Sequence, residues 1–188
     1  MPKTDIPDEL RKAMLEQLGS VPEPFEVLWN HPRLAEANQE FTAKLAACDA
    51  VDASLKTFAH MAVAAQIGCS WCLDINYFQA LNIGLHMEKA SQVPRWRESD
   101  LFTPLERDVL EYAEAMSNTP VIVADELAAR LLDQLGPEAM VELNVFIGFA
   151  NLATRCNVAQ GIESQGFSSA CEIPLAASSP GQGAISPA

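Results

Sequence analysis

The sequence predicts an all-α protein, and three observations lead to that prediction. Almost every segment repeats its apolar residues with the period of a helix, and no run shows the sustained alternation of a strand. Capping residues and glycines stand where such helices would begin and end. The chain has 188 residues, 49% of them hydrophobic, so it can fill one core but is too short for two ordinary domains.

The N-terminal part of the chain, residues 1–50, is expected to hold helices that pack on the core. Residues 8–18 carry an amphipathic helical pattern. Residues 25–29 form a brief helical turn, and Pro32 at a first helical position opens a helix over residues 33–47.

The core is expected to span residues 51–172 and to be built around an αα-hairpin. Asp52 caps a long alanine-rich helix that ends at Gly68, where a left-handed C-cap requires no Cβ. A second helix begins at Cys69 and Cys72, which directly follow that glycine. The pattern therefore predicts a CxxC motif at the N-terminus of a core helix.

The second half of the core is expected to add three helices. Thr103 begins a capping box for the first of them. The next helix covers residues 125–135. The last covers residues 137–165 and is apolar around much of its circumference. Such a helix lies at the centre of a bundle or in a subunit interface. Residues 173–188 have too little apolar surface to fold and are expected to form a disordered tail.

The formal net charge of −13 excludes several kinds of partner. A phosphate backbone or an anionic membrane would repel this surface, so we expect neither nucleic acid nor membrane as a partner. The sequence begins without a secretory signal and has no apolar run of membrane-spanning length, which predicts a cytoplasmic protein. Cytoplasmic thiols are kept reduced, so a disulfide there would be catalytic and transient.

Cys69 and Cys72 are the most informative residues of the chain. Their spacing puts both sulfurs on one face of a helix, close enough to form a disulfide or to bind a metal. The positive end of a helix favours thiolate and lowers the thiol pKa. A zinc site would need a second ligand pair at recognisable spacing, so we expect no metal and no cofactor. Two inert buried cysteines are the structural alternative, and redox chemistry is favoured over it.

Residues 55–76, in which an alanine-rich helix ends in Gly-Cys-x-x-Cys, resemble the alkylhydroperoxidase D-like branch of the carboxymuconolactone decarboxylase family. The resemblance covers roughly residues 25–168. It implies that family's helical bundle and a peroxidase-like thiol oxidoreductase that cycles Cys69 and Cys72 between dithiol and disulfide. A small hydroperoxide or a disulfide would be the substrate, and a dithiol protein the reductant. The resemblance also implies a homo-oligomer, trimeric or hexameric.

Three proton-handling positions depart from the family pattern. The family's peroxidases carry a glutamate where this chain has Thr57, a histidine where it has Asn76 and, in some members, a histidine where it has Trp71. We therefore expect weak peroxidase activity. His60, one turn after Thr57, is a candidate replacement because a neutral imidazole there could accept a thiol proton; a histidine hydrogen-bonded inside the bundle is the alternative. Asn76 could orient a thiolate or sulfenate but cannot take up a proton at neutral pH.

The order in which the two cysteines act stays open. The resemblance implies that Cys72 attacks and Cys69 resolves, whereas the helix dipole alone favours the thiol nearer the helix start, which could be Cys69. Asp74 is expected to complement the helix dipole. Cys156 in the last helix is expected to be buried and inert, with a third redox thiol as the alternative.

Two further functions compete with the thiol oxidoreductase. A decarboxylase-type lyase would need a cationic pocket for the substrate carboxylates, and the sequence has no basic cluster near the cysteines. A non-catalytic oligomeric family member with relic cysteines is the other, and the three altered positions support it.

Overall fold

A computed structural model of the chain describes residues 1–177. In this range the chain is all-helical, as predicted, and its elements are α1 (Asp8–Leu18), α2 (Glu23–Leu28), α3 (Pro32–Ala46), α4 (Ala53–Ile67), α5 (Ser70–Asn82), α6 (Met87–Ser91), η1 (Val93–Glu98), α7 (Pro104–Ser117), α8 (Asp125–Ala159) and η2 (Phe167–Ala170).

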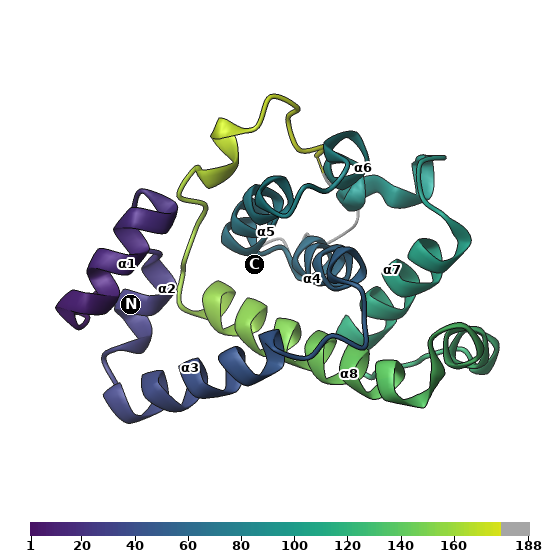
Figure 1. The fold of residues 1–188 in the computed structure, drawn as a ribbon, viewed down its shortest axis with the longest axis horizontal. Helices are drawn as coiled ribbons and strands as arrows, with labels where there is room; N and C mark the ends of the chain where they lie inside the picture. The colour runs from purple at the N-terminus through teal and green to yellow at the C-terminus, as the bar shows by residue number, and fades with distance from the viewer. Residues whose placement is uncertain (178–188) are drawn as a thin grey trace, which may run out of the picture.

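Helix α4 lies at the centre of the bundle, and α5, α7 and α8 pack around it (Figure 1). Its alanine-rich sequence lets the neighbouring helices approach closely, and eight of its residues are buried. Asp52 caps its N-terminus by accepting a hydrogen bond from the Ser54 amide, and Gly68 ends it in the left-handed conformation. Both predicted caps are therefore confirmed, and together they place the following cysteines at the start of α5.

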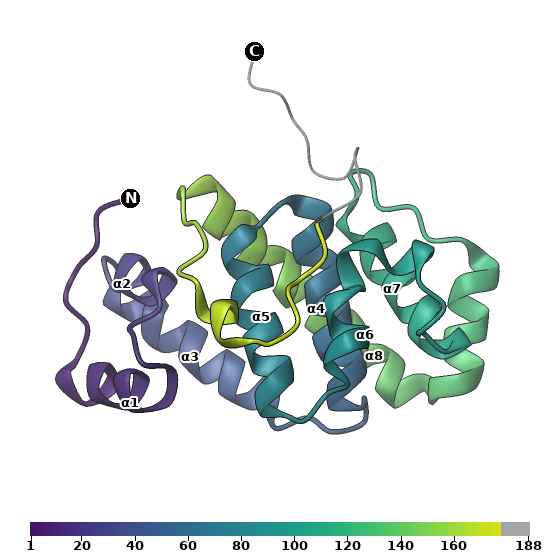
Figure 2. The ribbon, with the colours of Figure 1, turned by 90° about the horizontal axis from the view of Figure 1, so that it is seen from above.

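The main core forms where α4, α5, α7 and α8 meet. Phe58, Met61, Leu110, Leu143 and Ile147 are among its fully buried side chains. Burying one such side chain contributes about 1.5–3 kcal/mol, so this cluster holds the four helices in place. Helices α1 to α3 lie to one side of the bundle (Figure 2).

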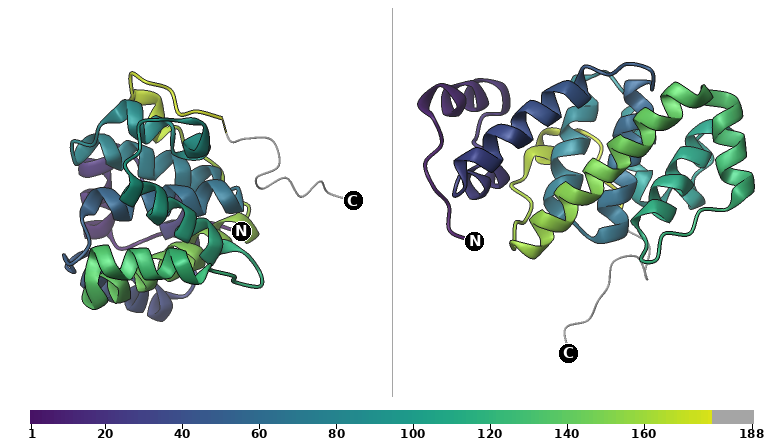
Figure 3. Two further views of the ribbon diagram at one scale, coloured as in Figure 1. Left: turned by 90° about the vertical axis from the view of Figure 1, so that its right-hand side faces the viewer. Right: turned by 90° about the horizontal axis from the view of Figure 1, so that it is seen from below.

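Helix α8 crosses α4 and α5 and changes direction at Gly136 (Figure 3). The φ angle of +78° at this glycine breaks the helix where the sequence predicted an end, and Pro137 follows. The predicted end of the last helix at residue 165 was wrong. The helix stops at Ala159 because Gly161 adopts a left-handed conformation and the chain turns back across α5.

The C-terminal segment lies against the bundle as far as it is described. The Tyr77 hydroxyl donates a hydrogen bond of 2.6 Å to the carbonyl of Ile173, and the Ala176 amide donates one of 2.9 Å to the carbonyl of Ser91. These bonds hold the first residues of the predicted disordered tail to the core. The remainder of that predicted tail, residues 178–188, lies outside the described residues. In residues 1–177 no helix has both the length and the apolar character needed to cross a bilayer.

Candidate active site

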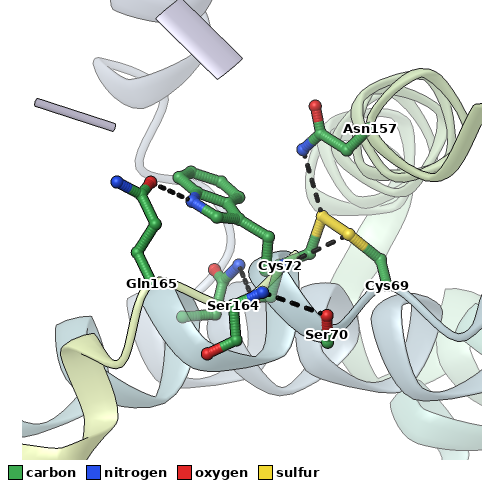
Figure 4. Close-up of a disulfide and its surroundings, with 8 residues drawn as sticks. Cys69, Ser70, Cys72, Asn157, Ser164 and Gln165 are labelled. Carbon is green, nitrogen blue, oxygen red and sulfur yellow. Dashed lines mark hydrogen bonds between the residues drawn. A yellow bond between two sulfur atoms is a disulfide. The ribbon is translucent and has the colours of Figure 1, made fainter. Parts of the chain in front are cut away.

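Cys69 and Cys72 form a disulfide at the N-terminus of α5 (Figure 4). Cys69 is the N-cap residue, and its sulfur accepts a hydrogen bond of 3.2 Å from the Cys72 amide. Cys72 lies in the first helical turn, and the two Cα atoms are 5.3 Å apart. Each cysteine is only 1% exposed. The local sequence thus places both sulfurs at the positive end of a helix dipole, as the glycine and the cysteine spacing predicted.

The sulfur of Cys72 has a polar partner from a distant part of the chain. The Asn157 side-chain amide on α8 donates a hydrogen bond of 3.4 Å to this sulfur (Figure 4). Asn76, which the sequence suggested for this role, instead donates a bond of 2.7 Å to the backbone carbonyl of Cys72. The sequence offered no signal for Asn157, because 85 residues separate it from Cys72 and only the crossing of α8 over α5 brings them together.

A pocket of about 560 Å³ lies beside Cys72, between α2, α3, α4, α5 and α8. Cys72 is part of its wall, whereas Cys69 is not. The wall contains four aromatic residues, Phe25, Trp71, Phe146 and Phe149. Leu34 and Leu152 also line it and are both 56% exposed. A small molecule in the pocket therefore lies against Cys72 rather than against Cys69.

His60 also lines this pocket, one turn along α4 from Thr57. Its Nε2 atom is buried and has no hydrogen-bond partner in the described part of the chain, so the imidazole is not satisfied inside the bundle. Its ring packs edge-on against Phe146, with 6.0 Å between the ring centroids. Burial lowers the pKa of His60 to about 4, so the ring is neutral at pH 7. A group with this pKa is a weak base but a good hydrogen-bonding partner for a neutral molecule.

Thr57 and Trp71 occupy two of the positions at which the family pattern has acid or base groups. The Thr57 hydroxyl donates a hydrogen bond of 2.9 Å to the Ala53 carbonyl, so its hydrogen bond is made within α4. The Trp71 indole donates one of 2.7 Å to the side-chain oxygen of Gln165. Gln165 also accepts from the Glu23 amide and donates to the Val21 carbonyl. These bonds connect the start of α2 to α5, the helix that carries the CxxC motif.

Asp74 lies on another face of α5 and is 3% exposed. Its carboxylate accepts hydrogen bonds from the Ser164 hydroxyl and from the amides of Gly166, Phe167 and Ser168, at 2.6 to 3.0 Å. Burial acts to raise the pKa of Asp74, but these bonds outweigh it, so the pKa lies below its ordinary value. Asp74 therefore anchors the segment that follows α8, a role beyond the predicted effect on the helix dipole.

Cys156 differs from its prediction, because it is exposed and lies in the wall of the same pocket as Cys72. The prediction failed because the C-terminal end of α8 turns this face toward the pocket rather than toward the core. Among the described residues, no three His, Cys, Asp or Glu side chains come close enough together to hold a metal ion.

Fold and site together define an all-helical protein that carries a disulfide-forming CxxC motif beside a ligand-sized pocket. The sequence model of the carboxymuconolactone decarboxylase family matches residues 32–115 of the chain. The resemblance seen in the sequence is thereby confirmed, and the helical arrangement is that of the alkylhydroperoxidase D-like bundle.

A relative in sequence and several solved structures are also similar to this chain. The uncharacterized protein YnjA of Escherichia coli strain K12 is 36% identical to this chain over 124 residues. The match covers 66% of each chain, so this chain spans just under two thirds of that relative's length. The debrominase Bmp8 has the same fold, with a TM-score of 0.76, 22% identity and coverage of 86% of this chain and 87% of Bmp8. A cysteine-to-alanine variant of Bmp8 has been crystallised with 2,3,4-tribromopyrrole. A peroxidase-related protein from Silicibacter sp. TM1040 matches with a TM-score of 0.73, 17% identity and coverage of 85% of this chain and 87% of that protein.

Proposed function

We propose that the protein is a thiol-dependent oxidoreductase that reduces a hydroperoxide, with Cys72 as the attacking thiol and Cys69 as the resolving thiol. One observation carries the proposal: Cys72 lines the pocket, whereas Cys69, the N-cap of α5, does not. This placement favours the order of attack that the family resemblance implies. The order that the helix dipole alone would have allowed has less support.

The proposed reaction has two steps. The Cys72 thiolate attacks the terminal peroxide oxygen, the O–O bond breaks, and the alkoxide leaves as an alcohol after taking a proton, so that Cys72 becomes a sulfenic acid. The Cys69 thiol then attacks the Cys72 sulfur, the S–O bond breaks, and water leaves. The hydroperoxide gains two electrons, and the two thiols become the disulfide of the structure.

The surroundings of Cys72 supply the thiolate without a strong base. The start of α5 and the Asn157 amide both favour negative charge on the Cys72 sulfur. His60 remains neutral at pH 7 and is too weak a base to hold a thiol proton. We therefore assign thiolate stabilisation to the helix and Asn157, and the proton passes to solvent.

The proposal is tested by treating the reduced protein with cumene hydroperoxide. Oxidation should remove two hydrogens from the peptide that holds both cysteines, and Cys72→Ser should abolish the reaction. In Cys69→Ser, a sulfenic acid should accumulate on Cys72 and react with dimedone. If hydroperoxide leaves both thiols of the wild type free for many minutes at neutral pH, the proposal fails.

A pH titration of thiol reactivity separates this proposal from a non-catalytic protein with relic cysteines. A pKa clearly below the ordinary value of about 8.5 supports the enzyme, and an ordinary pKa supports the relic. The decarboxylase-type lyase has less support, because no lysine or arginine of the described chain lines the pocket.

Recycling requires a reductant, for which we propose a dithiol protein in the cytoplasm. Both sulfurs are almost fully buried, so the reducing thiol must reach Cys72 through the pocket. The test is whether a thioredoxin-type dithiol protein reduces the Cys69–Cys72 disulfide. The reduction is monitored through the consumption of that protein's electron donor. No reduction of the disulfide by any dithiol protein would contradict it.

We also propose that the protein forms a homo-oligomer through α3 and α8. Outside the pocket lining, three apolar side chains of these helices are exposed in the single chain: Phe41, Val141 and Val145. Covering them would remove this apolar surface from water. Light scattering should report more than one chain per particle, and Val141→Lys should shift the protein toward monomer. A wild-type monomer would refute this proposal.

Reductive debromination is a second candidate for the same pair. The uncharged, aromatic pocket suits a halogenated ring, and the debrominase Bmp8 shares the fold. In this reaction the Cys72 thiolate takes the bromine, the ring carbon takes a proton, and Cys69 displaces bromide to close the disulfide. Each disulfide formed should release one bromide from 2,3,4-tribromopyrrole. Without bromide release, this candidate is discarded.

A further inference from the structure

The wall of the pocket beside Cys72 carries no charged side chain among the residues that the structure describes. Its polar members are neutral hydroxyl, amide, thiol and imidazole groups, and His60 is uncharged at pH 7. An anion entering this pocket would lose its hydration without gaining a counter-charge, which costs several kcal/mol. The formal net charge of −13 adds a repulsion of the same sign.

The size and lining of the pocket indicate an organic ligand. Its volume of about 560 Å³ lies within the range of about 300–1,000 Å³ that is usual for small-molecule sites. Hydrogen peroxide would leave most of this space empty, whereas a ring or a branched alkyl group would contact the aromatic wall. Phe146 and Phe149 from α8 and Phe25 from α2 face this space from different helices.

His60 supplies one unused hydrogen-bonding atom in this mostly apolar wall. Its Nε2 is buried and lacks a partner within the described residues. Leaving such an atom unpaired costs about 1–3 kcal/mol, so a ligand that pairs with it recovers part of that free energy. A neutral molecule with an apolar body and one oxygen at this position would satisfy both features of the pocket.

We propose that the pocket selects neutral aromatic or branched-alkyl hydroperoxides and rejects those that carry a carboxylate, with His60 Nε2 as the hydrogen-bond partner of the ligand oxygen. This inference rests on the proposed thiol reaction and names its substrate class. It makes cumene hydroperoxide a good substrate and the hydroperoxide of a fatty acid a poor one.

Binding to the disulfide form tests the selectivity without any chemistry. The two probes are 2-phenylpropan-2-ol, which is the alcohol product of cumene hydroperoxide, and the same alcohol with a para-carboxylate. Calorimetry should give an affinity for the neutral alcohol that is about tenfold or more higher, equivalent to at least about 1.4 kcal/mol. His60→Phe, which keeps an aromatic ring but removes the polar atom, should weaken the neutral alcohol about fivefold. Equal affinity for the two probes, or binding of neither, overturns the inference.

A matched pair of charge variants shows whether the pocket wall itself causes the selectivity against the carboxylate probe. Gln79 is exposed at the edge of the pocket, and Gln17 is exposed on α1 outside it. Gln79→Arg should strengthen binding of the carboxylate probe about fivefold relative to the neutral alcohol, because it supplies the missing counter-charge. Gln17→Arg adds the same charge and should change neither affinity. An equal effect of both variants would overturn the assignment to the wall.

The binding results and the proposed function can fail separately. If the disulfide form binds the neutral probe selectively but the reduced protein ignores cumene hydroperoxide, the thiol reaction is wrong and the neutral site stands. If the reduced protein consumes cumene hydroperoxide and its para-carboxylate derivative at equal rates, the reaction stands and the selectivity is wrong.

Discussion

Cys72 and Asp74 lie two residues apart on α5 and are both almost fully buried, yet their surroundings differ completely. The Asp74 carboxylate receives four hydrogen bonds from the segment after α8. Cys72 faces a pocket with one amide at its sulfur and an unpaired imidazole nitrogen of His60 in the same wall. One face of the helix has its polar groups satisfied and stabilises the fold. The other keeps polar groups available for a ligand.

Cys72→Ser should have the largest effect of any change that tests this comparison. We expect kcat/KM for cumene hydroperoxide to fall by about a thousandfold or more, equivalent to about 4 kcal/mol, because a hydroxyl at this site is a far weaker nucleophile than a thiolate. Peroxidase kinetics measure the loss, and thermal unfolding of the reduced proteins checks that the variant is folded. Retention of a tenth of the activity would show that Cys72 is not the attacking thiol.

Asp74→Asn should instead lower the stability of the protein, because it changes the face of α5 whose polar groups are hydrogen-bonded. The variant loses the charge that four donors share, and its amide NH₂ group cannot accept their hydrogen bonds, so the free energy of unfolding should fall by about 2–3 kcal/mol. Urea denaturation measures this change. The rate of Cys72 oxidation in the folded variant should stay within about threefold of the wild type. A stable variant with slow thiol chemistry would reverse the assignment of the two faces.

His60 in the pocket wall and Asp74 on the other face of α5 should also titrate in different pH ranges. The pKa of His60 is lowered in the fold, so between about pH 6.5 and 4 the unfolded state binds more protons and stability falls by about 3 kcal/mol as pH drops. Asp74 has a lowered pKa, so its stabilisation is present above about pH 3.8 and is lost as pH falls through its folded pKa. Urea denaturation as a function of pH should show that His60→Phe flattens the first range and Asp74→Asn the second. Unchanged slopes in either variant would contradict the corresponding assignment.

Cys156→Ser should have the smallest effect, although this thiol lines the same pocket as Cys72. It is exposed and lies outside the disulfide, so turnover of cumene hydroperoxide should change by less than about twofold. Mass spectrometry should find the same Cys69 to Cys72 disulfide after oxidation. A disulfide that includes Cys156, lost in the variant together with activity, would make it a third redox thiol.

The sequence by itself determined the helices and the place of the reactive pair. The capping box at Thr103, the break at Gly136 and the end of α4 at Gly68 were all predicted, because capping and helix breaking depend on hydrogen bonds and backbone angles within a few residues. The spacing of Cys69 and Cys72 likewise predicted a possible disulfide, since three residues of one helical turn set the distance between their sulfurs.

Only the tertiary structure decided what surrounds that pair. Asn157 reaches the Cys72 sulfur, the segment after α8 satisfies Asp74, and Cys156 turns to the pocket because of how α8 crosses α5 and where it ends. These contacts join residues more than eighty positions apart, and no local pattern specifies them. Packing between helices sets which sulfur meets the pocket, because burial and access depend on all the neighbouring elements at once.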